Sequence, residues 1–323
     1  MKVARLLLTA AVAAASLAPA ASRAQDYPRQ DIHFVCAFPA GSGADTIVRY
    51  FAEKARAITG RTVIVENRVG AAGNIATEYV SRSKPDGYTV FVSSAAAFAA
   101  SMSLYSQPPV ADVNKSIQVV ATINRQPFML TVDAGSPYKT TKDLTTAMVA
   151  KGEKASYATV SAFSTVVGEF YKLATGVKAV EVNYKAAADA LNDMKSGAID
   201  YSVSEPVFSL AQQRAGRWRI LGVSTGERLQ ASPDLPTLAE QGIPMDIDGW
   251  WAAMVPAATP KPIVDQLNKW FVEIVSSEET RKFLANFGGD PLIETPAKGQ
   301  ERLLKDVEKW KEYVRVAKIP QRG

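Results

Sequence analysis

Residues 25–323 alternate short apolar runs with segments whose apolar residues recur at helical spacing, a pattern typical of α/β proteins. Ile32–Phe38 is predicted as a buried strand, and the breaker Pro39–Gly43 separates it from a helix that Gly60 ends. Further strands are predicted at Thr62–Val65, Tyr88–Ser93, Ile117–Ile123, Phe128–Val132, Ser156–Ala158, Val180–Val182, Ile199–Val203, Arg219–Ser224 and Gly249–Val255. Further helices are predicted at Asn74–Arg82, Lys142–Val149, Ser164–Thr175, Ala186–Ser196, Val207–Ala215, Pro262–Val275, Glu278–Phe287 and Ala297–Lys318. This order predicts βα units with largely parallel sheets.

The length of 323 residues favours two domains over one. The chain is 47% hydrophobic and 21% charged, a balance that excludes a disordered protein. We therefore expect an ordinary folded chain with substantial apolar cores.

The first 24 residues have the pattern of a secretory signal peptide. Lys2 and Arg5 precede the apolar run Leu6–Ala18, and the small-residue site Ser22–Ala24 follows. The apolar run is too short to cross a bilayer, so we expect a mature periplasmic chain from Gln25.

Charge patterning argues against nucleic acid as a partner. Without the predicted signal peptide, 34 basic residues stand against 32 acidic ones, and the two signs are interspersed. A basic footprint of the kind that nucleic-acid-binding proteins carry is missing from the sequence.

Cysteine and histidine chemistry is nearly excluded by composition. Cys36 is the only cysteine and lies in the first predicted strand, so a packed thiol is expected rather than a reactive one. His33, the only histidine, is expected to be structural. We therefore expect no metal site and no cofactor.

Catalytic motifs are missing, whereas one loop suits an anion. Gly41–Ser42–Gly43 is neither a nucleophile elbow nor a complete dinucleotide fingerprint. A glycine-rich turn before a helix exposes backbone N–H groups and the positive end of the helix dipole, which favours a carboxylate. The alternative, that Gly41 and Gly43 only form the turn, stays open on this loop alone.

Seven ordered segments resemble signatures of one receptor family. They are Phe38–Asp45, Val65–Ile75, Lys84–Thr89, Val182–Lys185, Gly197–Asp200, Asp234–Gly242 and Val255–Pro260. Together they resemble the tripartite tricarboxylate transporter substrate-binding family, also called the Bug receptors, over essentially the whole mature chain.

The resemblance implies a two-domain periplasmic binding protein fold, type II-like, with a ligand cleft between the domains and two crossover segments. Domain 1 would comprise residues 25–123 and 250–323, and domain 2 residues 124–249. The implied first-domain site lies at Phe38, Ala40, Gly41, Ser42, Gly43, Asp45, Ser93 and Ser94.

The second domain departs from the family pattern. Relatives usually have a glycine-rich stretch where this chain has Thr159–Val167, without glycine and about two residues shorter. Thr159, Ser161, Ser164 and Thr165 still offer hydroxyls and a helix N-terminus, and Phe163 adds an apolar wall. Where relatives commonly carry Asp-Asn, this chain has Ser204-Glu205, which favours a dicarboxylate or an aromatic carboxylate over an amino acid.

The function implied is capture of a small carboxylate by domain closure and its delivery to a tripartite tricarboxylate-type transporter, by a monomer and without catalysis. One alternative is a sensor that signals through a sensor kinase, and another is a secreted hydrolase that uses Ser42 or Asp45. Arg125 is expected in a surface ion pair or on the ligand. Trp250 and Trp251 are expected as hinge packing or as a ligand-stacking surface.

Overall fold

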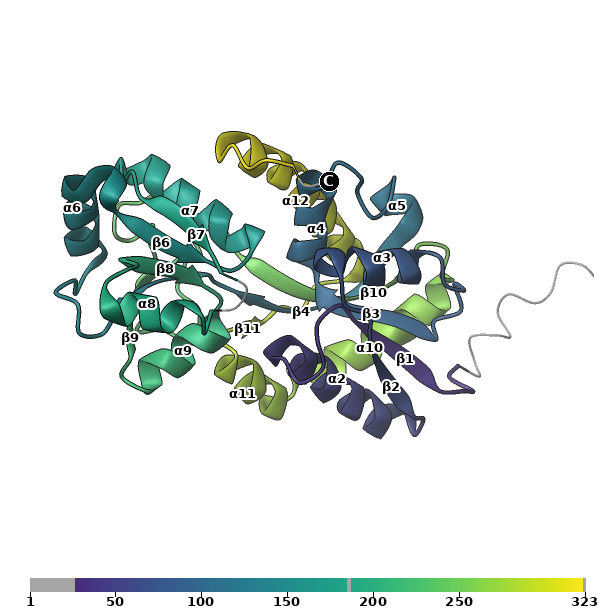
Figure 1. The fold of residues 1–323 in the computed structure, drawn as a ribbon. Coiled ribbons are helices and arrows are strands. Elements are labelled where there is room, and N and C mark those ends of the chain that lie inside the picture. The colour runs from purple at the N-terminus through teal and green to yellow at the C-terminus, as the bar shows by residue number, and fades with distance from the viewer. Residues whose placement is uncertain (1–26, 185–186, 322–323) are drawn as a thin grey trace, which may run out of the picture.

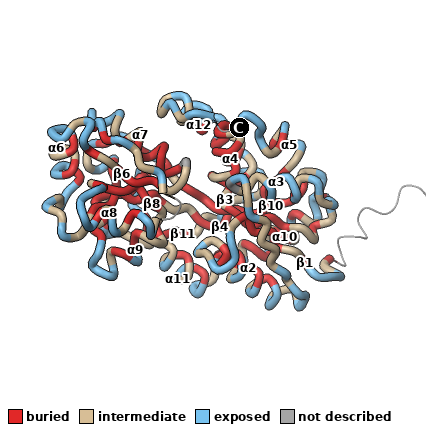
Figure 2. Tube along the Cα trace, viewed as in Figure 1, coloured by how far each residue is buried: buried red, intermediate tan, exposed pale blue. Residues whose placement is uncertain are grey.

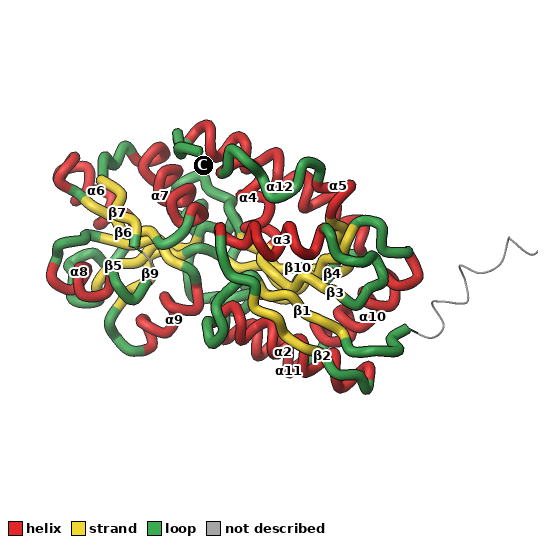
Figure 3. The backbone as a smooth tube through the Cα atoms, turned by 45° about the vertical axis from the view of Figure 1, so that its right-hand side comes forward, coloured by secondary structure: helices red, strands yellow, loops and turns green. Residues whose placement is uncertain are grey.

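The computed structural model describes residues 27–184 and 187–321, and its elements form two lobes that each contain one sheet (Figure 1). The predicted signal peptide, residues 1–24, lies outside the described residues. In Figure 3 the strands of the two sheets form separate groups with loops between them. No helix in the described part of the chain combines the length and apolar character needed to cross a bilayer.

The first lobe is built on a six-stranded sheet. Its strands, in spatial order, are β11 (Asp290–Pro291), β4 (Ile117–Gln126), β10 (Gly249–Pro256), β3 (Thr89–Ser94), β1 (Ile32–Cys36) and β2 (Val63–Asn67). Its helices are α2 (Gly43–Thr59), η1 (Ala71–Gly73), α3 (Asn74–Ser81), α4 (Ala95–Leu104), α5 (Val113–Ser116), α10 (Lys261–Ser276), α11 (Glu278–Asn286) and α12 (Pro296–Val316). Buried residues place α2, α10 and α11 on one face of this sheet and α3, α4 and α12 on the other.

The second lobe is built on a five-stranded sheet. Its strands, in spatial order, are β7 (Val180–Asn183), β6 (Ser156–Thr159), β8 (Tyr201–Ser204), β5 (Met129–Asp133) and β9 (Trp218–Val223). Its helices are α6 (Thr141–Lys151), η2 (Gly152–Lys154), α7 (Ala162–Thr175), α8 (Ala190–Ser196) and α9 (Pro206–Arg214). The predicted helix Ala186–Ser196 is therefore shorter, and residues 185–186 are not described.

The prediction of largely parallel sheets is wrong for about half of the strand pairs. β1 pairs in parallel with β2 and β3, and β6 does so with β7 and β8. β10 is antiparallel to β3 and β4, and β5 is antiparallel to β8 and β9. Both β5 and β10 enter their sheets directly from the other lobe, so each runs against the parallel strands that it joins.

Apolar packing continues from one lobe into the other. Phe163 of α7 stacks on Phe128 with ring centroids 4.4 Å apart and meets Trp310 of α12 edge-on at 5.0 Å. Phe170 and Tyr313 add a second contact between the same two helices. Figure 2 shows buried residues along the strands of both lobes, and one apolar cluster contains buried residues from each of them. Phe163 therefore packs at the lobe junction.

Candidate functional site

The loop between β1 and α2 is organised by the start of the helix. Ser42 is the N-cap of α2, and its Oγ accepts a hydrogen bond from the Asp45 amide at 3.2 Å. The same hydroxyl donates to the Pro39 carbonyl at 2.7 Å. Gly41 has a φ of +79°, which glycine adopts readily. The loop therefore presents the N-terminus of a 17-residue helix, a favourable environment for an anion.

Asp45 supports this loop from the inside. It is 1% exposed, and its carboxylate accepts hydrogen bonds from the Gly41 amide, Arg49 and Asn67 at 2.7–2.8 Å. Burial acts to raise the pKa of Asp45, but these hydrogen bonds outweigh it and hold the pKa below its ordinary value. The geometry gives Asp45 the task of fixing the loop backbone.

Asp45→Asn is expected to lower the free energy of unfolding at pH 7 by about 1–3 kcal/mol, because charged hydrogen bonds are lost at a buried site. Since the folded-state pKa of Asp45 is depressed, its contribution is present above the unfolded-state pKa and is lost as the pH falls through the folded-state pKa. The difference from wild type should therefore shrink below about pH 4 in urea titrations. Asp265→Asn is the control, because Asp265 forms an exposed pair with Lys261. An equal effect of both substitutions would contradict the supporting role.

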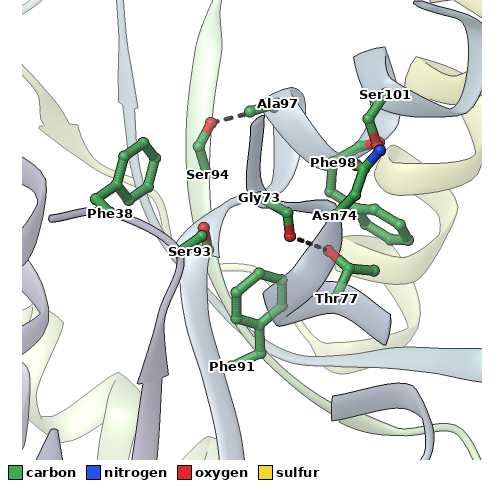
Figure 4. Close-up of a pocket in the computed structure, with 11 residues that line it drawn as sticks. Phe38, Gly73, Asn74, Thr77, Phe91, Ser93, Ser94, Ala97, Phe98 and Ser101 are labelled. Carbon is green, nitrogen blue, oxygen red and sulfur yellow. Dashed lines mark hydrogen bonds between the residues drawn. The ribbon is translucent and has the colours of Figure 1, made fainter. Parts of the chain in front are cut away.

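Ser93 and Ser94 end β3 beside a small pocket (Figure 4). Ser94 is the N-cap of α4 and accepts from the Ala97 amide at 3.2 Å, whereas Ser93 is 3% exposed. The pocket has a volume of about 10 Å³, room for one water molecule. Asn74, which is not among the predicted site residues, also lines it, and its buried Oδ1 has no partner among the described residues.

Phe38, in the loop between β1 and α2, forms an aromatic pair with Trp251 of β10. The ring of Phe38 stacks on Trp251 with centroids 5.6 Å apart. Trp251 lies opposite Ser94 in the β10–β3 ladder, so the two side chains share one face of the sheet. Trp251 thus contacts the first predicted loop through Phe38 and shares a sheet face with Ser94, whereas Ser93 projects from the opposite face.

In the second lobe the predicted hydroxyls are engaged in local structure. Ser161 and Ser164 form a capping box at the start of α7, and Ser164 is fully buried. Thr159 donates to Glu181 at 2.6 Å, and Thr165 donates to the same carboxylate oxygen. These contacts fix the first turn of α7.

The end of β8 brings a carboxyl group to the start of α9. Ser204 is fully buried and shares a hydrogen bond of 2.7 Å with Ser202. Glu205 is the N-cap of α9 and accepts from the Phe208 amide at 3.2 Å. Burial raises the pKa of Glu205, and backbone hydrogen bonds only partly offset this effect.

The two lobes approach each other at these helix starts. Helices α2, α4, α7 and α9 each follow a parallel strand, and the carboxyl ends of such strands share one sheet edge. A Cβ on Gly43 would lie 3.6 Å from Val207 Cγ1, so the starts of α2 and α9 face each other across the junction. The sequence-selected residues therefore cluster at the facing edges of the two sheets.

Arg125 and Trp250 have protein partners on the crossover strands. Arg125 donates to Glu227 at 2.8 Å. Trp250 is fully buried, and its Nε1 donates to Asp306 at 2.6 Å. Both contacts favour the interpretations of Arg125 as an ion-pair residue and of Trp250 as hinge packing.

Cys36 and His33 have surroundings that suit structural roles. Cys36 is fully buried, and burial raises the pKa of its thiol. His33 Nδ1 lies 2.5 Å from Glu66 Oε1. Within the described ranges, no group of three or more histidine, cysteine, aspartate or glutamate residues is placed to hold a metal ion.

Two α/β lobes, joined by crossover strands and facing each other through helix N-termini, define the class of bilobal solute-binding proteins. Residues 47–318 match the family model described as the tripartite tricarboxylate transporter family receptor. The chain belongs to this family, whose members are receptors rather than enzymes.

Curated relatives and solved structures agree with this assignment. The chain is 30% identical to a UPF0065 protein of Bordetella bronchiseptica, over 89% of this chain and 85% of that one. It is 27% identical to Protein BugT of Bordetella pertussis, over 98% of both chains. The structure of R. palustris Rpa4515 with adipate has a TM-score of 0.81 at 27% identity, covering 91% of this chain and 99% of that one. The periplasmic binding protein BugD has a TM-score of 0.78 at 28% identity, covering 92% and 100%.

Proposed function

We propose that this protein captures a small carboxylate, with a dicarboxylate or an aromatic carboxylate favoured, between its two lobes in the periplasm. The observation that carries the proposal is the facing pair of helix starts at Gly43 and Val207, because backbone amides there suit an anion. The adipate in the Rpa4515 structure supports the same ligand class.

The proposed site combines the residues selected from the sequence. In the first lobe the carboxylate would contact Phe38, Ala40 and the loop Gly41–Asp45, with Ser93 and Ser94 beside it. Thr159, Ser161, Ser164 and Ser204 would line the opposite lobe. Several of these hydroxyls already serve as helix caps, so their backbone amides and the helix dipoles would provide much of the recognition.

We assign residues 25–123 and 250–323 to one closing domain and residues 124–249 to the other. Polar contacts support a closed arrangement of the two. Asp290 of β11, in the first domain, accepts from the amides of Gln230 and Ala231, in the second, at 2.8 and 2.7 Å. Closure over the ligand would present one surface, made from both lobes, to a membrane partner.

The closed monomer would deliver its ligand to a tripartite tricarboxylate-type transporter. The predicted signal peptide supports a periplasmic location, and the family description supports a transporter as the partner. Delivery needs no catalysis, metal or organic cofactor.

A thermal-shift screen of residues 25–323 tests this proposal. Refolded protein, freed of carried-over ligand, is mixed with dicarboxylates, tricarboxylates, aromatic acids and amino acids. A ligand at 100 times its dissociation constant stabilises a fold by about 2.7 kcal/mol, which raises the melting temperature by several degrees. A selective shift with carboxylates is expected. Shifts confined to neutral solutes or amino acids would overturn the assignment.

A further inference from the structure

Asn124 is a fully buried polar side chain on the crossover strand β4. Its exposed fraction is 0%, and neither its Oδ1 nor its Nδ2 has a hydrogen-bond partner among the described residues. Buried side-chain amides in native proteins are nearly always hydrogen-bonded, because an unpaired group loses its hydration without compensation. Both the Oδ1 and the Nδ2 of Asn124 therefore lack the hydrogen-bond partner that a buried amide normally has.

The sheet places Asn124 on the same face as Trp251 and Ser94. Asn124 lies opposite Trp251 in the β10–β4 ladder, and Trp251 lies opposite Ser94 in the β10–β3 ladder. Cross-strand partners share one face, so all three side chains project to the same side. Since Trp251 stacks on Phe38, this is the side on which the β1–α2 loop packs.

Gly288 and Gly289 pack between Asn124 and the second lobe. A Cβ on Gly289 would lie 2.5 Å from Asn124 Nδ2, so only glycine leaves room for the amide at this point. A Cβ on the adjacent Gly288 would lie 2.6 Å from Pro206 Cβ in the second lobe. The Gly288–Gly289 segment therefore lies between Asn124 and Pro206, the first residue of α9. Gln126, two residues along β4, also has a buried Oε1 without a partner among the described residues.

We propose that Asn124 is a specificity-determining residue that hydrogen-bonds a carboxylate ligand bearing a hydroxyl group. The inference rests on the proposed carboxylate site. The Asn124 NH2 group would donate to a ligand carboxylate oxygen, and Oδ1 would accept from the ligand hydroxyl. An unsubstituted carboxylate can only accept, so it would leave Oδ1 unpaired in a buried site. A hydroxycarboxylate satisfies both ends of the amide.

Calorimetric titration of the refolded mature chain with matched acids tests the proposal. The pairs are succinate with 2-hydroxysuccinate, glutarate with 2-hydroxyglutarate, and adipate with 2-hydroxyadipate. Wild type is expected to bind the hydroxylated member of its best pair at least about tenfold more tightly, because sites built to bond a hydroxyl reject analogues that lack it. Asn124→Leu, which keeps the branched shape and the number of heavy atoms of the side chain, is expected to bring the two affinities within about threefold of each other.

Stability provides a readout that separates ligand recognition from a structural role. Without ligand, Asn124→Leu is expected to melt at or above the wild-type temperature, since it removes an unpaired buried amide. Asn268→Leu is the control, because Asn268 Nδ2 already donates to the Val120 carbonyl at 2.8 Å and its loss should only destabilise. If leucine prevents folding, Asn124→Ala, which only removes atoms, is titrated instead.

The outcomes distinguish the inference from the proposed function. A wild type that binds carboxylates without preferring the hydroxylated member overturns the role of Asn124 and leaves the receptor assignment standing. An Asn124→Leu protein that keeps the wild-type preference but melts lower assigns the amide a structural role and also overturns the inference. A wild type that binds neither member of any pair and shows no shift with any carboxylate overturns both.

Discussion

Gly288→Ala is expected to weaken ligand binding at least tenfold while both lobes stay folded. Gly288 has a φ of +70°, and an added Cβ would lie 2.6 Å from Pro206 Cβ and 2.8 Å from Leu210 Cδ1 of the opposite lobe. Overpacking of this kind costs about 1–3 kcal/mol, and 1.4 kcal/mol is a factor of ten in affinity. Because the clash exists only when the lobes meet, its cost falls on the closed state. Calorimetric titration measures the effect.

Gly216→Ala is the matched control for Gly288→Ala. Gly216 has a similar φ of +67°, but an added Cβ would meet nothing within 4 Å. Both variants should lose about 1 kcal/mol of folding stability to backbone strain, and only Gly288→Ala should lose affinity. Equal affinities in the two variants would show that binding does not require the lobes to meet at Pro206.

Trp250→Ala is expected to lower the free energy of unfolding by about 3–5 kcal/mol. Trp250 is fully buried where β10 returns to the first lobe, and its Nε1 donates to the buried Asp306 at 2.6 Å. The substitution opens a cavity and leaves Asp306 without that donor. Urea denaturation measures the loss, and a loss below about 1 kcal/mol would contradict close packing at this position.

Trp250→Phe separates the hydrogen bond from the packing. Burial raises the pKa of Asp306, and the Trp250 hydrogen bond partly offsets this effect, so without the indole the pKa should rise further. Because the folded-state pKa of Asp306 is raised, its contribution to the free energy of unfolding is fully present below the unfolded-state pKa and is lost as the pH rises through the folded-state pKa. The deficit of Trp250→Phe should therefore be larger at pH 8 than at pH 4. A deficit independent of pH would exclude this role of the bond.

Hydrophobic periodicity predicted most elements of the fold, since amphipathic helices and apolar strands carry local signals. It did not predict α4, Ala95–Leu104, because eight of its ten residues are buried and no polar face marks a helical period. It also missed the reversed direction of β5 and β10, because strand direction depends on where the chain crosses between lobes.

The sequence predicted only part of the candidate site. The glycine-rich turn and the hydroxyls marked loops that the structure brings to the facing edges of the two sheets, but the spacing could not show that Ser42, Ser94 and Ser161 cap helices. Nothing near Asn124 in the sequence distinguishes it. Its unpaired amide becomes visible only when β4, β10 and Gly289 come together.

Small-angle X-ray scattering of the refolded mature chain, with and without a carboxylate identified by thermal shift, tests the central claim of closure most directly. Closure of two lobes around a ligand predicts a smaller radius of gyration and a shorter maximum dimension in the bound protein, and Gly288→Ala should reach these values only at a ligand concentration at least about tenfold higher than wild type needs. Identical scattering of free and ligand-saturated wild-type protein would contradict capture by domain closure.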